Sequence, residues 1–171
     1  MSIWFVIIPL LIYLPMSIYA TYVSFVRIGK PRDRGGEYLH RTWESTHTFL
    51  ILSVNYFVWL YSAAVADVVD KVAPVAILFG FVFIVRMALY LQLFYIKTTA
   101  DPSHILDRLF AWSNVLLLVL VAIIGLQTYS VVRAGHYEAN DILAQLLMPG
   151  IILIVPLVAV PLYFLYASNS E

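Results

Sequence analysis

The chain has 171 residues, of which 63% are hydrophobic and 12% are charged, and its formal net charge is +0. A water-soluble domain carries about 25% charged residues, so this composition excludes an ordinary soluble protein. The balanced charge and the lack of a basic tail give no support for nucleic-acid binding. The absence of cysteine excludes disulfides, thiolate metal sites and Fe–S clusters.

Five apolar runs are long enough to cross a bilayer, which takes about 20 residues. The first run has no basic start and is longer than the core of a signal peptide, so we expect it to be retained as a helix. The runs predict an all-α integral membrane bundle that forms a single domain over residues 1–171. Its five transmembrane helices are expected at 2–26, 42–66, 72–96, 104–132 and 141–167. Aromatic residues that suit the membrane–water interface stand near their ends: Trp4, Tyr22, Trp43, Tyr95, Trp112, Tyr137 and Tyr166.

The distribution of lysine and arginine between the loops predicts the orientation, because cytoplasmic loops carry an excess of both. The loops after the first and third helices hold Arg27, Lys30, Arg32, Arg34, Arg41, Lys97 and Arg108. The two opposite loops hold only Lys71 and Arg133. We therefore expect the N-terminus outside and the C-terminus in the cytoplasm. The membrane would be a bacterial or archaeal cytoplasmic membrane, or an organelle membrane.

The first and fifth expected helices are rich in proline, with Pro9 and Pro15 in the first and Pro149, Pro156 and Pro161 in the fifth. Each proline removes a backbone N–H and frees the carbonyl four residues earlier, which kinks the helix. Two interpretations stay open: kinks that the packed bundle tolerates, or freed carbonyls that line a cavity for a ligand or an ion.

Glu37, His40, Glu44 and His47 recur at spacings of 3, 4 and 3 residues at the mouth of the second apolar run. On a helix this spacing places all four on one face. The start of the fourth helix brings His104 to the same side of the membrane. Imidazole binds haem iron, copper and zinc, and the ExxH spacing lets one helix supply two ligands to one metal.

Three interpretations of this cluster stay open. It is the solvated start of a helix, with Asp107 and Arg108 forming an ordinary charge pair on the fourth helix. It is a proton relay or a quinone site, since histidine titrates near neutral pH. Or it holds a haem b, copper or another transition metal, with the candidate ligands His40, Glu44, His47 and His104.

Arg86 is the most unusual residue, because it lies near the middle of the third expected helix. A charge at the centre of a membrane helix costs roughly 3 kcal/mol on insertion scales. Counting inward from the helix ends puts Asn55 at the same depth, and Asn114 about one turn nearer the cytoplasm. We expect Arg86 to be met by amides, hydroxyls, freed carbonyls or water, or by a group from another molecule. No carboxylate of the chain is expected to reach Arg86, since Glu44 and Asp67 are expected near opposite membrane faces.

Three functions follow from these features. The leading interpretation is a small subunit of a larger membrane complex of redox or respiratory type, either structural or helping to hold a haem, a metal or a quinone. The second is a small transporter or channel for an anionic or other small solute, using Arg86 and the kinked first and fifth helices. The third is a small membrane metalloenzyme that uses the histidine and glutamate cluster.

The sequence contains no phosphate-binding glycine loop, no GxSxG and no HExxH motif. We therefore expect the chain not to be catalytic on its own. Its expected partners are the lipid bilayer and other membrane subunits, and the question of a cofactor stays open between haem b, copper or another transition metal, and none.

Overall fold

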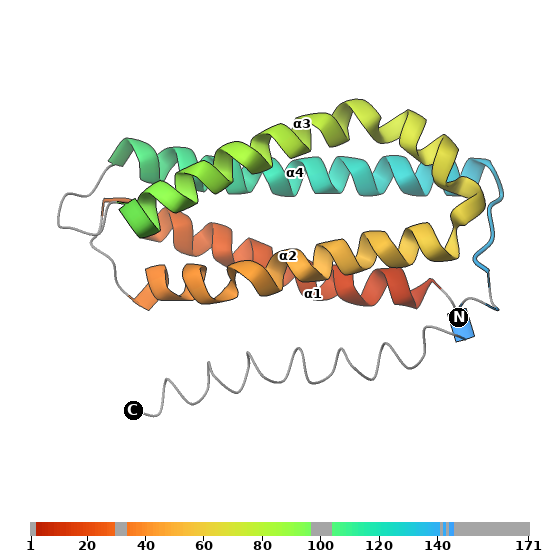
Figure 1. Cartoon of the computed structure of the whole chain (residues 1–171), viewed down its shortest axis with the longest axis horizontal. Helices are drawn as coiled ribbons and strands as arrows, with labels where there is room; N and C mark the ends of the chain where they lie inside the picture. The colour runs from red at the N-terminus through yellow and green to blue at the C-terminus, as the bar shows by residue number, and fades with distance from the viewer. Residues whose placement is uncertain (1–2, 30–33, 97–103, 141, 143, 146–171) are drawn as a thin grey trace.

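The computed structural model describes residues 3–29, 34–96, 104–140, 142, 144 and 145 (Figure 1). Of these residues 91% are helical and none forms a strand, which confirms the all-α class for this part of the chain. The elements are α1 Trp4–Val26, α2 Arg34–Leu60, η1 Ser62–Ala64, α3 Val65–Leu91, η2 Gln92–Ile96 and α4 His104–Ala134. Here η1 is a 3-10 turn and η2 is a π-helical turn that continues α3.

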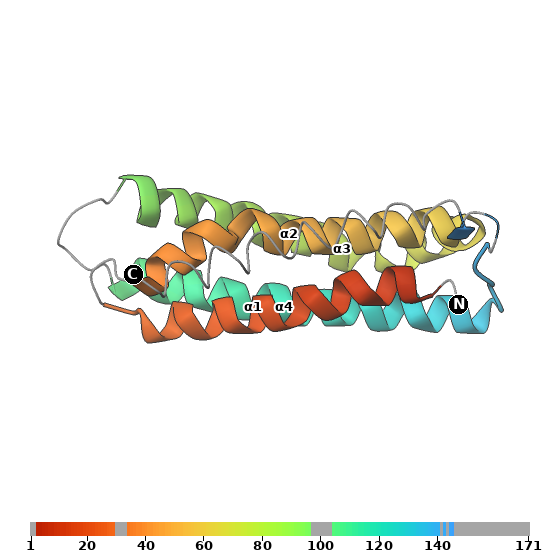
Figure 2. The same cartoon turned by 90° about the horizontal axis from the view of Figure 1, so that it is seen from below.

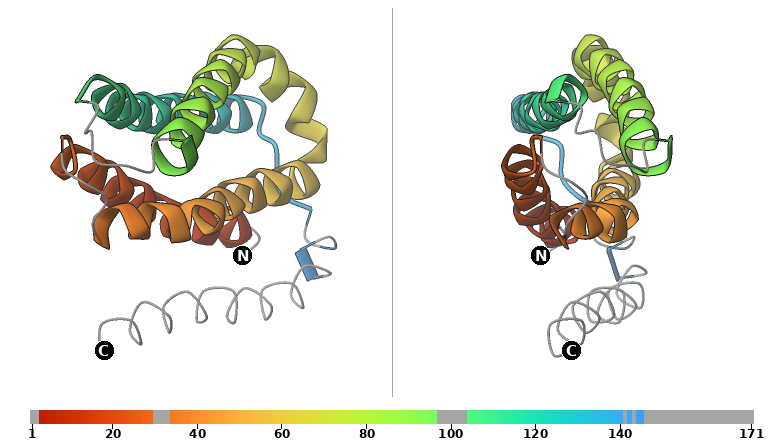
Figure 3. Two further views of the ribbon diagram at one scale, coloured as in Figure 1. Left: turned by 60° about the vertical axis from the view of Figure 1, so that its left-hand side comes forward. Right: turned by 90° about the vertical axis from the view of Figure 1, so that its left-hand side faces the viewer.

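The four long helices run alternately up and down, side by side along the length of the bundle (Figure 2), and seen end-on they stand at the corners of a rough square (Figure 3). The end-on view in Figure 3 shows α1 beside both α2 and α4, and α3 beside α4. Short connections join consecutive helices, so neighbours in sequence are antiparallel. The end at which α1 and η2 stop and α2 and α4 start carries most of the lysine and arginine, and we call it the basic end. The other end, where α1 starts and α4 stops, is called the distal end.

The corner between α2 and α3 lies at residues 61–64, earlier than the sequence predicted. The second helix is Arg34–Leu60 rather than 42–66, and the third starts at Val65 rather than 72. The reason is that the corner is largely apolar and partly buried: Tyr61 is 7% exposed and Ala64 is 0% exposed, whereas Ser62 and Ala63 are exposed. An apolar corner continues the hydrophobic run, so hydropathy alone does not mark where one helix ends and the next begins.

Within the described residues, three helical stretches are long and apolar enough to cross a membrane, namely Trp4–Val26, Ser62–Phe94 and Ile105–Ala134. Their outer faces expose large apolar side chains, as lipid contact requires, and they support a membrane protein. In α2 only Thr46–Leu60 is apolar, because the first half of that helix is polar. The fifth expected helix, 141–167, lies outside the described residues except for 142, 144 and 145. The count of five spans and the orientation stay predictions.

Two of the expected prolines, Pro9 and Pro15, stand inside α1. Pro74, which the sequence analysis did not single out, stands inside α3. Figure 1 shows that α3 bends in its N-terminal part, the part that contains Pro74. Proline bends a helix because it lacks the N–H that would bond one turn back. The prolines of the fifth expected helix lie outside the described residues.

Candidate functional site

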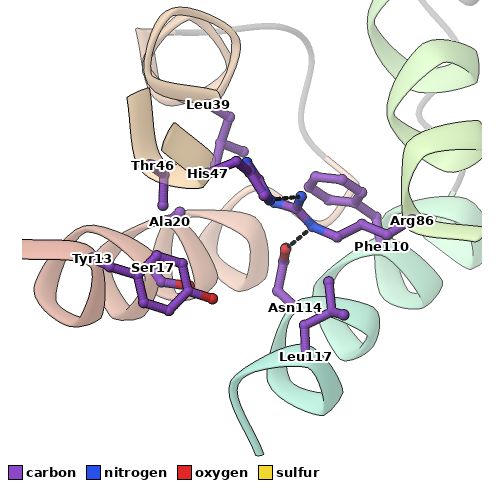
Figure 4. A pocket seen from close by; sticks show the side chains of 10 residues that line it. All are labelled: Tyr13, Ser17, Ala20, Leu39, Thr46, His47, Arg86, Phe110, Asn114 and Leu117. Carbon is purple, nitrogen blue, oxygen red and sulfur yellow. Dashed lines mark hydrogen bonds between the residues drawn. The ribbon is translucent and has the colours of Figure 1, made fainter. Parts of the chain in front are cut away.

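Arg86 lies inside the bundle and not on its lipid-facing surface, with only 6% of the residue exposed. Its side chain reaches a cavity to which all four long helices contribute (Figure 4). The cavity is lined by Tyr13, Ser17 and Ala20 of α1, Leu39, Thr46 and His47 of α2, Arg86 of α3, and Phe110, Asn114 and Leu117 of α4. Six of these ten side chains are polar, which is unusual in the interior of an apolar bundle.

Two groups from different helices hold the guanidinium. Its Nε donates a hydrogen bond to Oδ1 of Asn114, and its Nη1 lies 3.3 Å from Nε2 of His47 (Figure 4). Since a guanidinium only donates, Nε2 of His47 must act as the acceptor. This contact is a hydrogen bond only when the imidazole is neutral and carries its proton on Nδ1.

Asn114 is itself held by a second bond, which orients its amide. Its Nδ2 donates to Oγ of Ser24 over 3.0 Å, and Ser24 donates to the carbonyl of Ala20 over 2.7 Å. A chain of hydrogen bonds therefore leads from Arg86 across α4 to the backbone of α1. Because the amide nitrogen faces Ser24, the amide oxygen is the atom presented to Arg86.

Aromatic rings surround the charged group. The Cζ atom of Arg86 lies 5.3 Å from the centroid of the Phe110 ring, within the range of a cation–π interaction. The ring of His47 meets that of Phe83 edge to face, with centroids 5.1 Å apart. These rings limit the movement of both side chains and reduce the access of water to their contact.

The cavity lies where three apolar clusters meet. Tyr13 belongs to the cluster that extends toward the distal end, whereas Ala20, Leu39 and Phe110 belong to the one at the basic end. Leu117 belongs to a third cluster, between α3 and α4. The cavity has a volume of ≈ 20 Å³ for the centre of a water-sized molecule. About 10–15 Å³ on this measure is enough for one water, so the cavity has room for one or two water-sized molecules.

A second buried arginine lies at the basic end and has a different environment. Arg27 donates to Oδ1 of Asp107 over 3.0 Å, and the N–H of Gly29 donates to Oδ2 of the same carboxylate over 3.1 Å. The Cζ atom of Arg27 lies 4.5 Å from the centroid of the Phe94 ring, which belongs to η2. The ion pair between Arg27 and Asp107 ties the end of α1 to the start of α4. One interpretation of the sequence took Asp107 and Arg108 as a charge pair. In the structure Arg108 is exposed, and the carboxylate of Asp107 accepts a hydrogen bond from Arg27.

The structure brings Arg86 and Asn114 together and leaves Asn55 apart from them. Arg86 and Asn114 each lie 10 residues from the basic end of their helices, from 96 to 86 and from 104 to 114. Asn55 is exposed on α2 and does not line the cavity. The expectation for Asn55 depended on a second helix at 42–66; with α2 at Arg34–Leu60, the residue at mid-helix is His47.

Of the candidate metal or haem ligands, only His47 has a described side chain. The side chains of His40, Glu44 and His104 lie outside the described part, so a metal or haem site that includes them stays a prediction. Among the described residues no three histidines or acids are grouped to hold a metal ion. Nε2 of His47 faces the guanidinium of Arg86, and a cation at that distance opposes the binding of a metal ion to the same nitrogen.

The polar residues of α1 and α2 at the cavity, Tyr13, Ser17 and Thr46, were not predicted from the sequence. A signal for the contribution of α1 was present, since Ser17, Thr21 and Ser24 recur at spacings of 4 and 3 along an otherwise apolar helix. That spacing places all three on one face, which is the face toward the bundle interior for Ser24. Small polar residues on the inward face of a membrane helix are typical of interhelical contacts.

Comparisons with protein-family models, with curated proteins and with solved structures find no match to this chain.

Proposed function

We propose that this protein is a small membrane carrier that binds an anionic solute at Arg86. The observation that carries the proposal is the cavity at which a buried guanidinium and polar side chains from all four long helices meet. Burying a charge in an apolar bundle is costly, and charged residues in such positions commonly mark a pathway for an ion or a substrate. A guanidinium is suited to carboxylates, oxyanions and halides because all of its hydrogen-bonding groups are donors.

The exposed aromatic residues support an estimate of how deep the Arg86 site lies in the bilayer. Trp4, Trp59 and Tyr129 are exposed toward the distal end, and Tyr22 and Trp112 toward the basic end. Along α1 the two levels are about 27 Å apart, close to the roughly 30 Å of a hydrocarbon core. In this placement Asn114 lies only about 3 Å deeper than Trp112, so the arginine head is near the basic-side interface. Such a position lowers the cost of the charge and shortens the route to water.

The surroundings of the cavity favour a carrier over an open channel. Large apolar side chains, among them Tyr56 and Leu60, fill the bundle toward the distal end. Others, including Phe94 and Phe110, fill it toward the basic end. A polar site enclosed between two apolar layers corresponds to the occluded state of a carrier, in which the solute has access to neither side.

The alternative of a redox or respiratory subunit stays a prediction from the sequence. A cavity of ≈ 20 Å³ at Arg86 is far smaller than the roughly 300–1,000 Å³ of pockets that enclose organic ligands. A haem or quinone would therefore have to bind elsewhere, for example at the cluster that includes His40 and His104. Purification in mild detergent followed by an absorption spectrum tests this alternative. A Soret band that is lost in His47→Ala would favour it over the carrier.

Transport in liposomes tests the carrier directly. Purified protein is reconstituted, and uptake of labelled chloride, nitrate, formate and phosphate is measured against empty liposomes. We expect uptake of at least one anion, with a loss of at least about tenfold in Arg86→Gln, because a charged hydrogen-bond partner is removed. Asn55→Gln is the matched control, since it alters a polar side chain on the exposed face of α2. Equal uptake by the Arg86→Gln variant and the unaltered protein would refute the proposal.

A further inference from the structure

We infer that the lipid-facing surface at the basic end binds the headgroup of an anionic phospholipid through Arg108 of α4. The surface formed by Arg108 and Trp112 of α4 and by Tyr22 and Phe25 of α1 is called the headgroup patch. The patch lies on the outside of the bundle and not at the Arg86 cavity, so the inference does not depend on the carrier proposed above.

Arg108 is exposed and has no counter-charge in its own neighbourhood. It follows Asp107 directly in the chain, but both oxygens of that carboxylate accept from the end of α1, one from Nη2 of Arg27 and the other from the N–H of Gly29. Within the described part of the chain, the side chain of Arg108 forms no ion pair and no hydrogen bond. Its five N–H donors are therefore available to a ligand outside the bundle.

The side of α4 that carries Arg108 is a lipid-facing side. Exposed apolar side chains continue from it along the helix at spacings of four or three residues, as Trp112, Leu116, Val119, Ile123 and Leu126. That spacing places them on one face. Apolar side chains exposed on a membrane helix contact lipid chains, so Arg108 stands at the end of a lipid-contacting row.

The depth of Arg108 corresponds to the headgroup layer of the bilayer. Trp112 and Tyr22 are both 62% exposed, and exposed aromatic residues near the ends of membrane helices mark the membrane–water interface. Arg108 lies four residues before Trp112 and is therefore about 6 Å further toward the basic end. A headgroup layer of roughly 5–8 Å covers each side of the hydrocarbon core. The guanidinium is thus at the level of the lipid phosphate groups.

Contacts with α1 hold the tryptophan of the patch in place. The ring of Trp112 meets the ring of Phe25 edge to face, with centroids 5.6 Å apart, and the ion pair of Arg27 with Asp107 fixes the end of α1 to α4. Residues four apart on a helix are neighbours, so the indole lies beside Arg108. A fixed ring offers a surface for the glycerol and the chains of a lipid, and a guanidinium binds a phosphate through two parallel hydrogen bonds.

The charge of the basic end favours an anionic lipid over a zwitterionic one. Residues 27–44 and 97–108, at this end, contain seven lysines and arginines and five acids. Residues 67–71 and 133–141, at the distal end, contain two lysines and arginines and four acids. A zwitterionic headgroup neutralises its phosphate with its own ammonium group, whereas an anionic headgroup keeps a net charge that basic residues near the surface attract.

Quenching of tryptophan fluorescence by brominated lipids tests the inference on the full chain. Trp4→Phe, Trp43→Phe and Trp59→Phe leave Trp112 as the only tryptophan, and the protein is reconstituted in vesicles of phosphatidylcholine. Equal shares of brominated phosphatidylglycerol or brominated phosphatidylcholine then replace the unbrominated lipid. We expect a preference of about fivefold for phosphatidylglycerol at Trp112, the gain from one arginine near an anionic surface. Arg108→Gln should remove most of this preference.

The distal end supplies the matched control. Tyr129 and Arg133 are also exposed and four residues apart, at the other end of α4, but acids outnumber basic residues there. Arg133→Gln should leave the preference at Trp112 unchanged. A protein that keeps only Trp59, which is exposed toward the distal end, should show no preference for phosphatidylglycerol. Where the triple exchange lowers the yield of folded protein, the difference between the unaltered protein and Trp112→Phe gives the same quantity.

The other outcomes would overturn the inference. A preference that persists in Arg108→Gln would assign the attraction to other basic residues, and an equal preference at Trp59 would show that it is not confined to this patch. No quenching of Trp112 by either lipid would mean that a second copy or another protein covers the patch. Sodium phosphate should lower the preference no more than sodium chloride of the same ionic strength, and a larger fall would identify free phosphate as the ligand.

Discussion

Two buried arginines in one small bundle have opposite surroundings. Arg27 and Arg86 are 7% and 6% exposed, and each lies near the face of a phenylalanine ring. Arg27 is paired with the carboxylate of Asp107, which also accepts the N–H of Gly29. Arg86 contacts an amide and an imidazole beside a water-sized cavity. Arg27 is paired with a carboxylate on another helix and so acts as a structural tie. Arg86 lies beside an enclosed polar cavity, where we propose that an anion binds.

The largest expected effect is the loss of stability on breaking the Arg27 pair. Asp107→Ala leaves a buried guanidinium without its carboxylate, and removing one partner of such a pair costs about 3–5 kcal/mol. We expect a large fall in the melting temperature in detergent, followed by the fluorescence of the four tryptophans. Arg108→Ala, which alters the exposed neighbour, should change the melting temperature little.

A double variant sharpens the same point. Replacing both partners, Arg27→Met with Asp107→Leu, removes the buried charges together, and such exchanges are often close to neutral in stability. We therefore expect the double variant to recover most of the loss seen in Asp107→Ala. Anion binding at Arg86 should be unchanged in it. A loss of binding would mean that the two arginines act as one unit, and the contrast between them would fail.

The next effect in size concerns the amide that positions Arg86. Asn114→Leu removes the acceptor for Nε and the donor to Ser24, and a hydrogen bond to a charged group is worth about 1.5–3 kcal/mol. We expect a lower melting temperature together with weaker anion binding, measured on the same sample. Asn55→Leu makes the same exchange on the exposed face of α2 and should change neither. Equal effects in the two variants would show that the site does not depend on the amide.

A smaller effect on anion binding is expected at Ser24, which lies one hydrogen bond further from Arg86 than Asn114 does. Ser24→Ala deletes the link between Asn114 and the carbonyl of Ala20, both neutral contacts, and a neutral hydrogen bond contributes about 0.5–1.5 kcal/mol. Because the amide of Asn114 would be less constrained, anion binding should weaken by no more than a few fold. Thr21→Ala, which removes a hydroxyl bonded only locally to the carbonyl of Ser17, serves as the control. A loss in Ser24→Ala as large as that in Asn114→Leu would contradict this order.

The sequence predicted the all-α class of the fold for reasons that particular residues make clear. Hydrophobic runs mark α1, α3 and α4 because these helices expose apolar side chains along most of their length. Counting residues inward from the helix ends predicted Asn114 about one turn from the depth of Arg86, and the structure brings the two side chains into contact. The corner at Tyr61 stayed hidden because it is as apolar as the helices it joins.

Other contacts depend on how the helices are rotated and on long-range pairing. Asn55 was expected near Arg86 because a helix at 42–66 placed it at mid-depth, and the true bounds of α2 move His47 to that position instead. Arg27 and Asp107 are 80 residues apart, and in the sequence the nearer Arg108 is an equally good partner. Only the packing of α1 on α4 decides between them. Periodicity describes one helix at a time and does not contain this information.

The smallest expected effect lies at the distal end, where an exposed contact gives a reference for the two buried ones. The hydroxyl of Tyr137 donates to Oδ2 of Asp67, and this hydrogen bond, followed by partial desolvation, raises the pKa of Tyr137 above 10.0. A raised pKa means that the folded protein holds its proton more tightly than the unfolded chain. The contribution of the contact to stability is therefore complete below pH 10.0, and it is lost as the pH rises through the higher pKa of the folded state.

Tyr137→Phe gives the measurement. The ultraviolet difference spectrum between the unaltered protein and this variant should show a tyrosine that ionises above 10.0, against the background of the other eleven of the 12 tyrosines. The small difference in melting temperature between the two proteins should shrink as that ionisation proceeds. Asp67→Asn keeps an acceptor and removes the charge, so the pKa of Tyr137 should move back toward its ordinary value. A tyrosine that ionises at its ordinary pKa in the unaltered protein would show that this contact does not persist in solution. The contact between Tyr137 and Asp67 would then give no information on the packing of the distal end. The buried contacts of Arg27 and Arg86 would not be affected by that result.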